Sequence, residues 1–479
     1  MTNIKFGTDG WRGIIGFDFN FLNLSKVVVA SSQELYSKYY KETKSKKILI
    51  GYDRRFMASQ FAQSIPPLIS GCGLEPILAS TYVTTPSCSL YAKENNFLGA
   101  LVITASHNPP TWLGLKIKDF RGCSVDESFT QSIEKRLLFG NSTYSKQSLF
   151  PIVDVKQFHL MKIKSKFNVG FIYEQLKKMR IRVIIDSMHG SAAGYFNKIF
   201  DETEMDIFSS IRNNEDPLFG GNPPEPLMKY LKDLNKVHQI NTENGYKSIG
   251  IVFDGDGDRI AVIDEKGRYC STQVLLPYFI KHLGSQNNNN LPVLKTVSGS
   301  DIIKSIAESQ NRRVIELPVG FKYIAENMIN AETFIGGEES GGVGFGDFLP
   351  ERDALYAAMV LLNRIAEESK YLSDSLDEIQ KEFGPSFYQR IDISFAELSQ
   401  KNNLVQFINN NIPRLIGNYE VLSITKIDGL KLRMGENFWV LFRFSGTEPL
   451  LRLYCEAPSQ EKLEKTLEWC QKFINEFVQ

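Results

Sequence analysis

The sequence carries no excess charge of either sign, because 55 lysine and arginine side chains balance 55 aspartate and glutamate side chains. A protein that binds nucleic acid, or one that is held on an anionic membrane, generally carries a surplus of positive charge. We therefore expect neither kind of partner. Recognition of a small anion would have to come from local clusters of side chains within the 479 residues.

Cysteine is also scarce, and long apolar runs are missing. The six cysteines are scattered, and no Cys-x-x-Cys motif occurs, so the sequence indicates neither a zinc site nor a disulfide framework. Reduced thiols are typical of cytoplasmic proteins, and we expect that location. The first residues, MTNIKFGTDGWRG, lack the apolar segment of a signal peptide, and no apolar run approaches the length that spans a bilayer.

What the sequence does contain is a repeated alternation of apolar runs with helical stretches. Runs such as KKILIGYD, GALVITAS, IGIVFDGD and TFIGGEES resemble buried strands that end in polar or glycine-rich loops. The alternation predicts α/β units with mixed or parallel sheets, whose ligands lie beyond the carboxyl ends of the strands. We expect three similar α/β domains over residues 1–150, 151–265 and 266–375. Antiparallel-type strands and a final helix predict a smaller α+β domain over residues 376–479.

The loop DGDGDR, residues 254–259, places three carboxylates on alternate residues. They repel one another unless a cation lies among them, and hard oxygen ligands indicate Mg²⁺ or Ca²⁺. A calcium-binding EF-hand fits poorly, because Arg259 stands where that loop needs glycine and the flanking runs are strand-like. We therefore predict a Mg²⁺ site held by Asp254, Asp256 and Asp258.

A second unusual loop, TASHNPP, follows the apolar run Leu101–Ile103. A serine at the end of a strand is by default a turn residue, and no Gly-x-Ser-x-Gly motif supports a hydrolase triad at Ser106. A phosphate on Ser106 would, however, supply a further ligand for the cation of the aspartate loop. Pro109 and Pro110 would then hold the loop rigid, as positioned phosphoryl transfer requires.

Two further loops carry polar groups after strand-like runs. RFSGTEP, residues 443–449, offers a guanidinium group, two hydroxyls and a glycine, which together suit a phosphate dianion. GGEESGG, residues 336–342, offers carboxylates and a hydroxyl that suit the hydroxyl groups of a sugar. Taken alone, either loop is also explained as an ordinary turn.

In this order, TASHNPP, DGDGDR, GEESGG and RFSGTEP closely resemble the α-D-phosphohexomutase superfamily, which includes phosphoglucomutase, phosphomannomutase, phosphoglucosamine mutase and phosphoacetylglucosamine mutase. The resemblance covers nearly the full length and extends to FGTDGWRG, DSMHG, GNPPEP and VGFKYI. It implies four domains around a central cleft, each giving one loop. The fourth domain would resemble the TATA-binding-protein fold.

The resemblance also implies roles for individual residues. The phosphoserine would be Ser106, which would bind Mg²⁺ together with the three aspartates. The reacting phosphoryl group would be flanked by Arg12, His107 and Lys116. The substrate would be bound by the remaining matched positions, namely Arg259, Lys322, Glu338, Ser340, Arg443, Ser445, Gly446 and Thr447.

The sequence departs from the common family pattern at a few positions. Thr111–Gly114 replaces the usual Tyr-Asn-Gly continuation of the serine loop, although the spacing to Lys116 is kept. Gly342 stands where many members have histidine. Glu339 stands where the glucosamine enzymes tend to have glutamine or methionine, which makes glucosamine a less favoured sugar.

The implied activity is the interconversion of hexose 1-phosphate and hexose 6-phosphate, with glucose or mannose as the sugar, in a monomer or dimer that binds small sugar phosphates. It would need Mg²⁺ and a hexose 1,6-bisphosphate as priming activator. The alternatives are a phosphoglucosamine mutase, a phosphopentomutase and a sugar-phosphate phosphatase. A different kind of alternative is a protein without catalytic activity that binds calcium through the aspartate loop.

Overall fold

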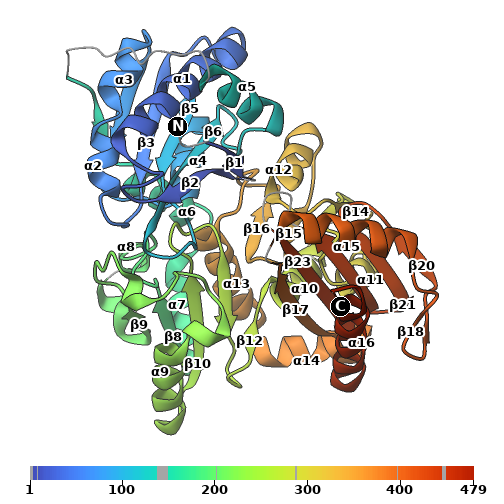
Figure 1. The fold of residues 1–479 in the computed structure, drawn as a ribbon. Helices are drawn as coiled ribbons and strands as arrows, with labels where there is room; N and C mark the ends of the chain where they lie inside the picture. Colours follow the sequence, from blue (N-terminus) through green and yellow to red (C-terminus); the bar gives the residue numbers. More distant parts are fainter. Residues whose placement is uncertain are drawn as a thin grey trace.

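The computed structural model describes residues 4–7, 9–137, 149–200, 202–285, 289–395, 397–444 and 449–478. Four larger sheets follow one another along the chain and mark four regions of the molecule (Figure 1). The N-terminal region lies above the second region in this view, and the C-terminal region lies to the right. Within the described residues, no helix is both long and apolar enough to cross a membrane.

The first sheet has seven strands in the order β1-β2-β6-β5-β3-β4-β7. Its central strand β5 has the sequence GALVI, and all five of these residues are buried. The strands are β1 (Phe6–Gly7), β2 (Gly10–Ile14), β3 (Lys47–Tyr52), β4 (Glu75–Ala79), β5 (Gly99–Ile103), β6 (Trp112–Asp119) and β7 (Ile152–Val153). The helices of this region are α1 (Phe21–Thr43), α2 (Ala58–Gln63), α3 (Pro66–Gly71), α4 (Thr85–Glu94) and α5 (Glu127–Leu137).

The second sheet has the order β12-β11-β10-β8-β9. Its strands are β8 (Ile181–Asp186), β9 (Phe208–Ile211), β10 (Lys247–Phe253), β11 (Ile260–Ile263) and β12 (Tyr269–Cys270). The α-helices here are α6 (Val155–Lys164), α7 (Val169–Lys178), α8 (Phe196–Ile199) and α9 (Lys232–Glu243), and the 3₁₀ turns are η1 (Glu202–Ile207), η2 (Phe219–Gly221) and η3 (Met228–Tyr230).

The third sheet has the order β14-β13-β15-β16. Its strands are β13 (Val293–Thr296), β14 (Val314–Leu317), β15 (Ile335–Glu338) and β16 (Gly342–Phe345). The helices are α10 (Thr272–Gly284), α11 (Ile302–Ser309), α12 (Phe321–Asn330), α13 (Ala354–Glu368) and α14 (Leu372–Phe383). Helix α13 is largely buried, and one apolar core joins it to side chains of both the second and the third region.

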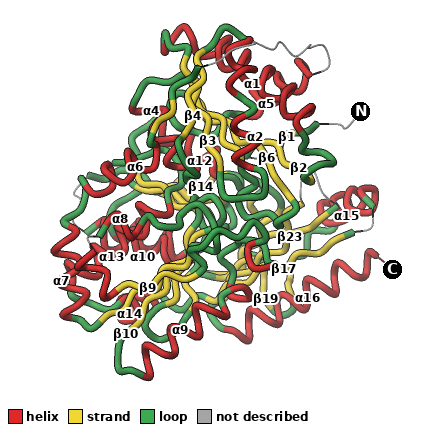
Figure 2. Tube along the Cα trace, turned by 90° about the vertical axis from the view of Figure 1, so that its left-hand side faces the viewer, coloured by secondary structure: helices red, strands yellow, loops and turns green. Residues whose placement is uncertain are grey.

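The fourth sheet, β17-β23-β22-β21-β20, is antiparallel throughout. It has its own apolar core, to which the last helix contributes. The elements are β17 (Phe387–Ser394), α15 (Leu398–Asn410), the small pair β18 (Leu415–Ile416) and β19 (Tyr419–Glu420), β20 (Ser423–Thr425), β21 (Leu430–Gly435), β22 (Phe438–Phe444), β23 (Leu450–Ala457) and α16 (Gln460–Val478). Figure 2 shows α16 along the edge of the molecule.

The first three sheets share one arrangement. Their strands include the series β6-β5-β3-β4, β11-β10-β8-β9 and β16-β15-β13-β14. In each series the last three strands are parallel, and the first pairs antiparallel with the strand before it in sequence. This confirms three similar α/β domains with mixed sheets and a C-terminal α+β domain. It also means that each predicted loop joins a central strand to an antiparallel neighbour.

Two elements bear on where the domains divide. β7 lies just after residue 150 and pairs with β4 of the first sheet, and α14 spans residue 375. Boundaries placed after these two elements would keep each sheet and its helices whole.

Candidate active site

Ser106 follows β5 and directs its hydroxyl group at the second domain. Its Oγ donates a hydrogen bond of 2.8 Å to Asp254 Oδ2, and the residue is 1% exposed. The backbone φ of Ser106 is +51°, a left-handed conformation that costs energy for a residue with a side chain. The side chain of Thr104 supports this turn by accepting a bond of 2.9 Å from the Ser106 amide. The loop therefore presents Ser106 in one defined, strained conformation.

A buried arginine, shortly after the end of β3, binds the backbone of the serine loop. Arg55 donates to the carbonyl oxygens of Ser106 (2.5 Å), Asn108 (2.7 Å), Pro109 (2.9 Å) and Trp112 (3.1 Å). A guanidinium group suits this task because its donors have a fixed planar geometry. A single side chain thus binds four carbonyl groups of the backbone around the serine.

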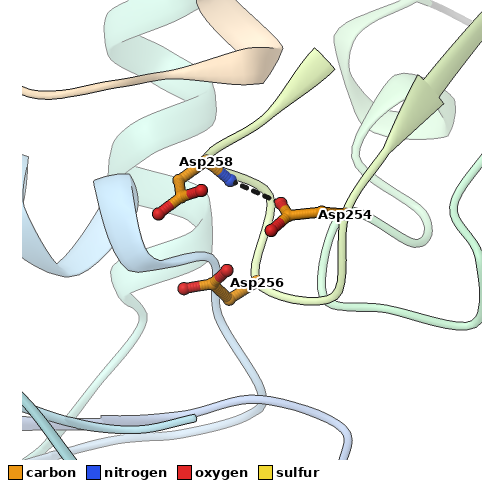
Figure 3. Close-up of side chains that lie close together, drawn as sticks. All are labelled: Asp254, Asp256 and Asp258. Carbon is orange, nitrogen blue, oxygen red and sulfur yellow. Dashed lines mark hydrogen bonds between the residues drawn. The ribbon is translucent and has the colours of Figure 1, made fainter. Parts of the chain in front are cut away.

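The three aspartates of the DGDGDR loop converge between β10 and β11 (Figure 3). One oxygen from each of Asp254, Asp256 and Asp258 lies within 4.8 Å of the other two, and all three residues are buried. The loop is closed by Asp254 Oδ1, which accepts bonds of 3.0 Å from the Asp258 amide and 3.1 Å from the Arg259 amide. Two glycines allow this sharp turn, one of them at a φ of +71°.

The carboxylates fit a divalent cation. The Oδ1 atoms of Asp256 and Asp258 are buried and accept no hydrogen bond from the described residues. Burial, with the charges of Asp258 and Asp256, raises the pKa of Asp254 well above its ordinary value. A hard divalent cation would bind these two oxygens and relieve this repulsion, and Arg259 Nε already lies 3.8 Å from Asp258 Oδ1 as an ion-pair partner. The oxygen-only ligand set is typical of Mg²⁺ or Ca²⁺.

Lys116 brings a positive charge against the same cluster. Its Nζ lies 2.8 Å from Asp256 Oδ2, from Asp258 Oδ2 and from Asp9 Oδ2, and the side chain is 1% exposed. Burial alone would lower the pKa of Lys116, but the three carboxylates raise it above the ordinary value. The ammonium group is therefore protonated beside Ser106 and the DGDGDR loop, which we call the metal loop after its predicted ligand.

The metal loop is held by backbone contacts with its neighbours. The carbonyl of Asp256 accepts a bond of 2.9 Å from the amide of Thr85 at the start of α4, and the Thr85 hydroxyl donates to the Asp256 carboxylate. The Gly255 carbonyl accepts from Ser191, and the Gly255 amide donates to Pro224 in the GNPPEP stretch. A Cβ atom on Gly255 would overlap the carbonyl oxygen of Ser106. The serine loop and the metal loop are thus in direct main-chain contact.

The GEESGG loop joins this assembly from the third domain. The amide of Ile260 donates a hydrogen bond of 3.0 Å to the carbonyl of Gly341, which ties the end of the metal loop to the GEESGG loop. We call the GEESGG loop the sugar loop after its predicted ligand. Glu338 ends β15, is 5% exposed and accepts a bond of 2.8 Å from Arg352. Ser340 follows in the turn and is partly exposed.

Other predicted residues lie around the serine. Arg12, on β2, donates 2.5 Å to Asn108 Oδ1 in the serine loop. His107 Nδ1 lies 3.4 Å from Ser106 Oγ, and burial together with Arg259 and Arg12 lowers the pKa of His107 well below its ordinary value. The imidazole is therefore neutral at pH 7.

The last predicted residues come from the third and fourth domains. Lys322, on α12, lies 3.7 Å from a carboxylate oxygen of Glu127 in the first domain. Arg443, at the end of β22, donates 2.8 Å to Asp428 Oδ2, which also accepts from the amide of Val319. Ser445, Gly446 and Thr447 lie outside the described residues.

Sequence reasoning missed three residues that assemble the site: Asp9, Arg55 and Arg352. Asp9 lies in the FGTDGWRG stretch, but nothing in the spacing indicated that it would bind Lys116. Arg55 follows a predicted strand end, which is a usual place for a functional residue. Arg352 lies beside the expected helix start at Asp353, and only the fold brings it to the loops.

Comparison with known proteins places these features in a family. The four domain families of phosphoglucomutase/phosphomannomutase match this chain in order. They are alpha/beta/alpha domain I at residues 3–142, domain II at 157–267, domain III at 272–383 and the C-terminal domain at 403–468.

Individual relatives extend over nearly the whole chain. A phosphoglucomutase/phosphomannomutase of Thermococcus kodakarensis is 26% identical and a phosphoglucosamine mutase of Methanocaldococcus jannaschii is 28% identical, each match covering 98% of both chains. A solved structure from Thermus thermophilus, described as a phosphomannomutase, has 28% identity and a TM-score of 0.85, with 99% of each chain covered. The relatives thus differ in the sugar that their names give. With all four domains matched in order, this chain belongs to the phosphoglucomutase/phosphomannomutase family of mutases.

Proposed function

We propose that this protein moves a phosphoryl group between positions 1 and 6 of glucose or mannose, through phospho-Ser106 and a hexose 1,6-bisphosphate. One observation supports this most directly. The hydroxyl of Ser106 lies 2.8 Å from a carboxylate of an aspartate cluster that fits a divalent cation, because two of its buried oxygens accept no hydrogen bond from the described residues. A phosphate on that hydroxyl would lie beside the cation and beside the ammonium group of Lys116.

The transfer is balanced without a further reactant. The bond between phosphorus and Ser106 Oγ breaks while a bond forms between phosphorus and the free hydroxyl oxygen of the sugar monophosphate. The proton of that hydroxyl ends on Ser106 Oγ. After the transfer Ser106 carries a free hydroxyl group, which is the form that donates a hydrogen bond to Asp254 in the structure. The bisphosphate then turns over, and its other phosphate returns to Ser106 by the reverse step.

The residues around the serine have distinct tasks in this proposal. Asp254, Asp256 and Asp258 would hold Mg²⁺ with the phosphoserine, and the bound ion would neutralise charge on the phosphoryl oxygens. Lys116 and Arg12 stabilise the charge of the transferring group from the first domain. His107 is neutral, so it adds no positive charge next to Ser106. The buried, strained serine loop keeps the oxygen in place.

The substrate would be bound by the outer residues. Glu338 and Ser340 would accept hydrogen bonds from the sugar hydroxyls in either orientation of the ring. Arg259 and Lys322 would contribute positive charge to the substrate site. The phosphate that does not react would be bound by Arg443, which Asp428 already orients, with Ser445, Gly446 and Thr447. These assignments follow the family pattern at matched positions.

Glucosamine phosphate is the second candidate substrate. Phosphoglucosamine mutases occur among the relatives at a similar level of identity. Moreover, Glu339, which argued against glucosamine in the sequence, accepts a bond of 2.9 Å from Ser298 and lies 3.7 Å from Arg390 of the fourth domain. Its carboxylate is thus engaged in structural contacts, so the residue at position 339 does not exclude a glucosamine substrate.

A substrate panel tests the proposal. The purified protein, given Mg²⁺ and a hexose 1,6-bisphosphate, is assayed with the 1-phosphates of glucose, mannose, glucosamine and ribose. We expect turnover to be fastest with glucose or mannose, whose product is the 6-phosphate, whereas the product from ribose 1-phosphate would be the 5-phosphate. A preference for glucosamine or ribose would replace the proposed sugar. Release of inorganic phosphate without isomerisation would instead identify a phosphatase.

A further inference from the structure

One buried arginine contacts carboxylates from three domains. Arg352 lies just before α13 and is 4% exposed. Its Nη1 donates 2.8 Å to Glu338 Oε1 of the sugar loop, and its Nη2 donates 2.8 Å to Asp258 Oδ2 of the metal loop. The same Nη2 donates 2.9 Å to Asp9 Oδ2 of the first domain. Even the nearest of these partners in sequence, Glu338, is 14 residues away along the chain.

Arg352 occupies one carboxylate oxygen of Asp258 in the metal loop and one of Glu338 in the sugar loop. Because Asp258 Oδ2 is bound by Arg352 and Lys116, a cation would bind at its Oδ1, which accepts no hydrogen bond from the described residues and lies 3.8 Å from Arg259 Nε. Because Glu338 Oε1 is bound by Arg352, the orientation of that carboxylate is fixed as well. A planar guanidinium group can serve both loops through separate nitrogen atoms, whereas a lysine presents only one nitrogen.

The backbone on either side of Arg352 is anchored. The carboxylate of Asp353 caps α13 by accepting bonds from the amides of Leu355 and Tyr356, and its other oxygen lies 2.7 Å from His159 of the second domain. The carboxylate of Glu351 pairs with Lys118 of the first domain at 2.5 Å. Arg352 therefore projects from a fixed point and cannot adapt by moving its main chain.

Gly342 makes room for this side chain. A Cβ atom built on Gly342 would overlap Cδ and Cγ of Arg352, and its three nearest atoms all belong to Arg352. Gly342 does not have a left-handed φ, so an alanine there meets no backbone strain of that kind. Its conflict would be with the arginine.

We propose that Arg352 is a positioning residue, which sets the metal loop and the sugar loop at one fixed distance, and that Gly342 is required because it admits the arginine side chain. The inference rests on the proposed function, since it assigns a task within that active site. Nothing in the contacts gives Arg352 a direct role toward the reacting atoms. Its effect on turnover would pass through Asp258 and Glu338.

A mutant cycle tests the inference, using wild type, Arg352→Ala, Gly342→Ala and the double variant. We expect Arg352→Ala to lower kcat/KM by about 30-fold or more, because small displacements of reacting groups are costly. Gly342→Ala should lower it by about 10-fold by displacing the same side chain. The double variant should be within about twofold of Arg352→Ala, since residues that act through one contact are not additive. Arg352→Lys should fall between wild type and Arg352→Ala.

Thermal unfolding without substrate or metal gives a second readout of the same cycle. Gly342→Ala should lower the melting temperature of the wild type but not that of Arg352→Ala, in which the overlapping atoms are gone. The matched control is Arg364→Ala. Arg364 lies on α13, has a side chain that is 3% exposed, and pairs with Glu367 and Glu368 of its own helix. It should cost stability while keeping kcat/KM within about threefold of wild type.

Several results would overturn the inference. The first is a double variant in which the losses of the two single variants multiply. The second is a loss in Arg352→Ala no larger than the loss in Arg364→Ala. The third is full activity in Arg352→Lys. Should Arg352→Ala fail to fold, Gly342→Ala and Arg352→Lys decide the question in the same way. An inactive wild type would instead refute the proposed function, and this inference with it, so the two failures are distinguishable.

Discussion

Ser106 Oγ donates a hydrogen bond of 2.8 Å to Asp254 Oδ2, although 148 residues separate them in the chain. The two residues lie at the ends of equivalent strands, β5 and β10, in two sheets of the same strand order. The contact therefore joins corresponding loops of two similar domains. It depends on how the two domains are docked.

Replacing Ser106 by alanine should remove mutase activity, by more than about 10³-fold, because the phosphoryl acceptor is lost. Intact mass measured on freshly purified wild-type protein should show a fraction carrying one phosphoryl group, and this fraction should be absent from the variant. Ser89→Ala is the control, since Ser89 is equally buried in the same domain and should leave both results unchanged. Full turnover by Ser106→Ala would refute a phosphoserine.

Removal of divalent metal should abolish activity, and Mg²⁺ should restore it. Addition of Mg²⁺ should also raise the melting temperature, because a ligand that binds the folded state stabilises it by about 2.7 kcal/mol at 100 times its dissociation constant. Differential scanning calorimetry with and without EDTA measures this effect. An enzyme that turns over fully in EDTA would contradict the metal site.

Asp256→Asn should lose most of the stabilisation by Mg²⁺, because it removes one of the convergent carboxylates. The matched control is Asp264→Asn, in a buried carboxylate that pairs with Arg268 at the neighbouring turn. That variant should respond to Mg²⁺ as the wild type does. Equal responses of the two variants would place the ion elsewhere.

Arg55→Met should impair transfer although Arg55 does not contact the hydroxyl of Ser106. The substitution removes the Arg55 donor from four loop carbonyls, of which that of Pro109 keeps a bond from the Trp112 amide. It also leaves Asp53 buried without its cation, and we expect a loss of about 3 kcal/mol in unfolding free energy. A displacement of the serine by about 1 Å would lower kcat by about 10²-fold. Urea unfolding and initial rates measure the two effects.

Arg54→Met provides the comparison for Arg55. Arg54 is also buried, but it donates to the carbonyl of Asn213 in the second domain and lies over the ring of Tyr82. It should lose stability with a much smaller loss of kcat. If both variants lose kcat equally, Arg55 has no special task at the serine loop.

Stability should depend on pH through Asp53. Burial, only partly offset by Arg55, raises the pKa of Asp53 to about 6, against about 3.9 in an unfolded chain. Between these values the folded state binds more protons than the unfolded state, so the free energy of unfolding falls as the pH rises. The contribution is about 3 kcal/mol from pH 4 to pH 6 and is constant above that range.

Asp53→Asn isolates this contribution, because the amide does not titrate. Urea unfolding of both proteins between pH 4.5 and pH 8 should show the wild type losing stability relative to the variant as the pH rises. A difference that stays flat, or that changes in the opposite direction, would contradict the raised pKa of Asp53.

The local chemistry of the site could be predicted from the sequence. Alternate aspartates between two apolar runs indicated a cation site, and the structure brings Asp254, Asp256 and Asp258 within reach of one another. The strand, loop and strand pattern around Ser106 and around Glu338 likewise matched antiparallel pairs in the fold. These features depend on neighbours in sequence, where periodicity and turn chemistry carry information.

Contacts between domains could not be predicted in this way. Arg352 meets Asp9, Asp258 and Glu338 only after three domains have docked, and no spacing relates these positions. Gly342 could be recognised as a departure from the family pattern, but its reason appears only when the side chain of Arg352 is placed beside it.

Gly255 has a further consequence, because a Cβ atom on Gly255 would overlap the carbonyl oxygen of Ser106, and a Cβ atom on Gly190 would overlap the main chain of Gly255. The separation between the serine oxygen and the acidic loop is thus set by main chain against main chain. The side chains that we expect to bind the sugar take no part in this main-chain contact. Relatives whose names give different sugars could in this way share one spacing between the two loops while the residues around the sugar differ.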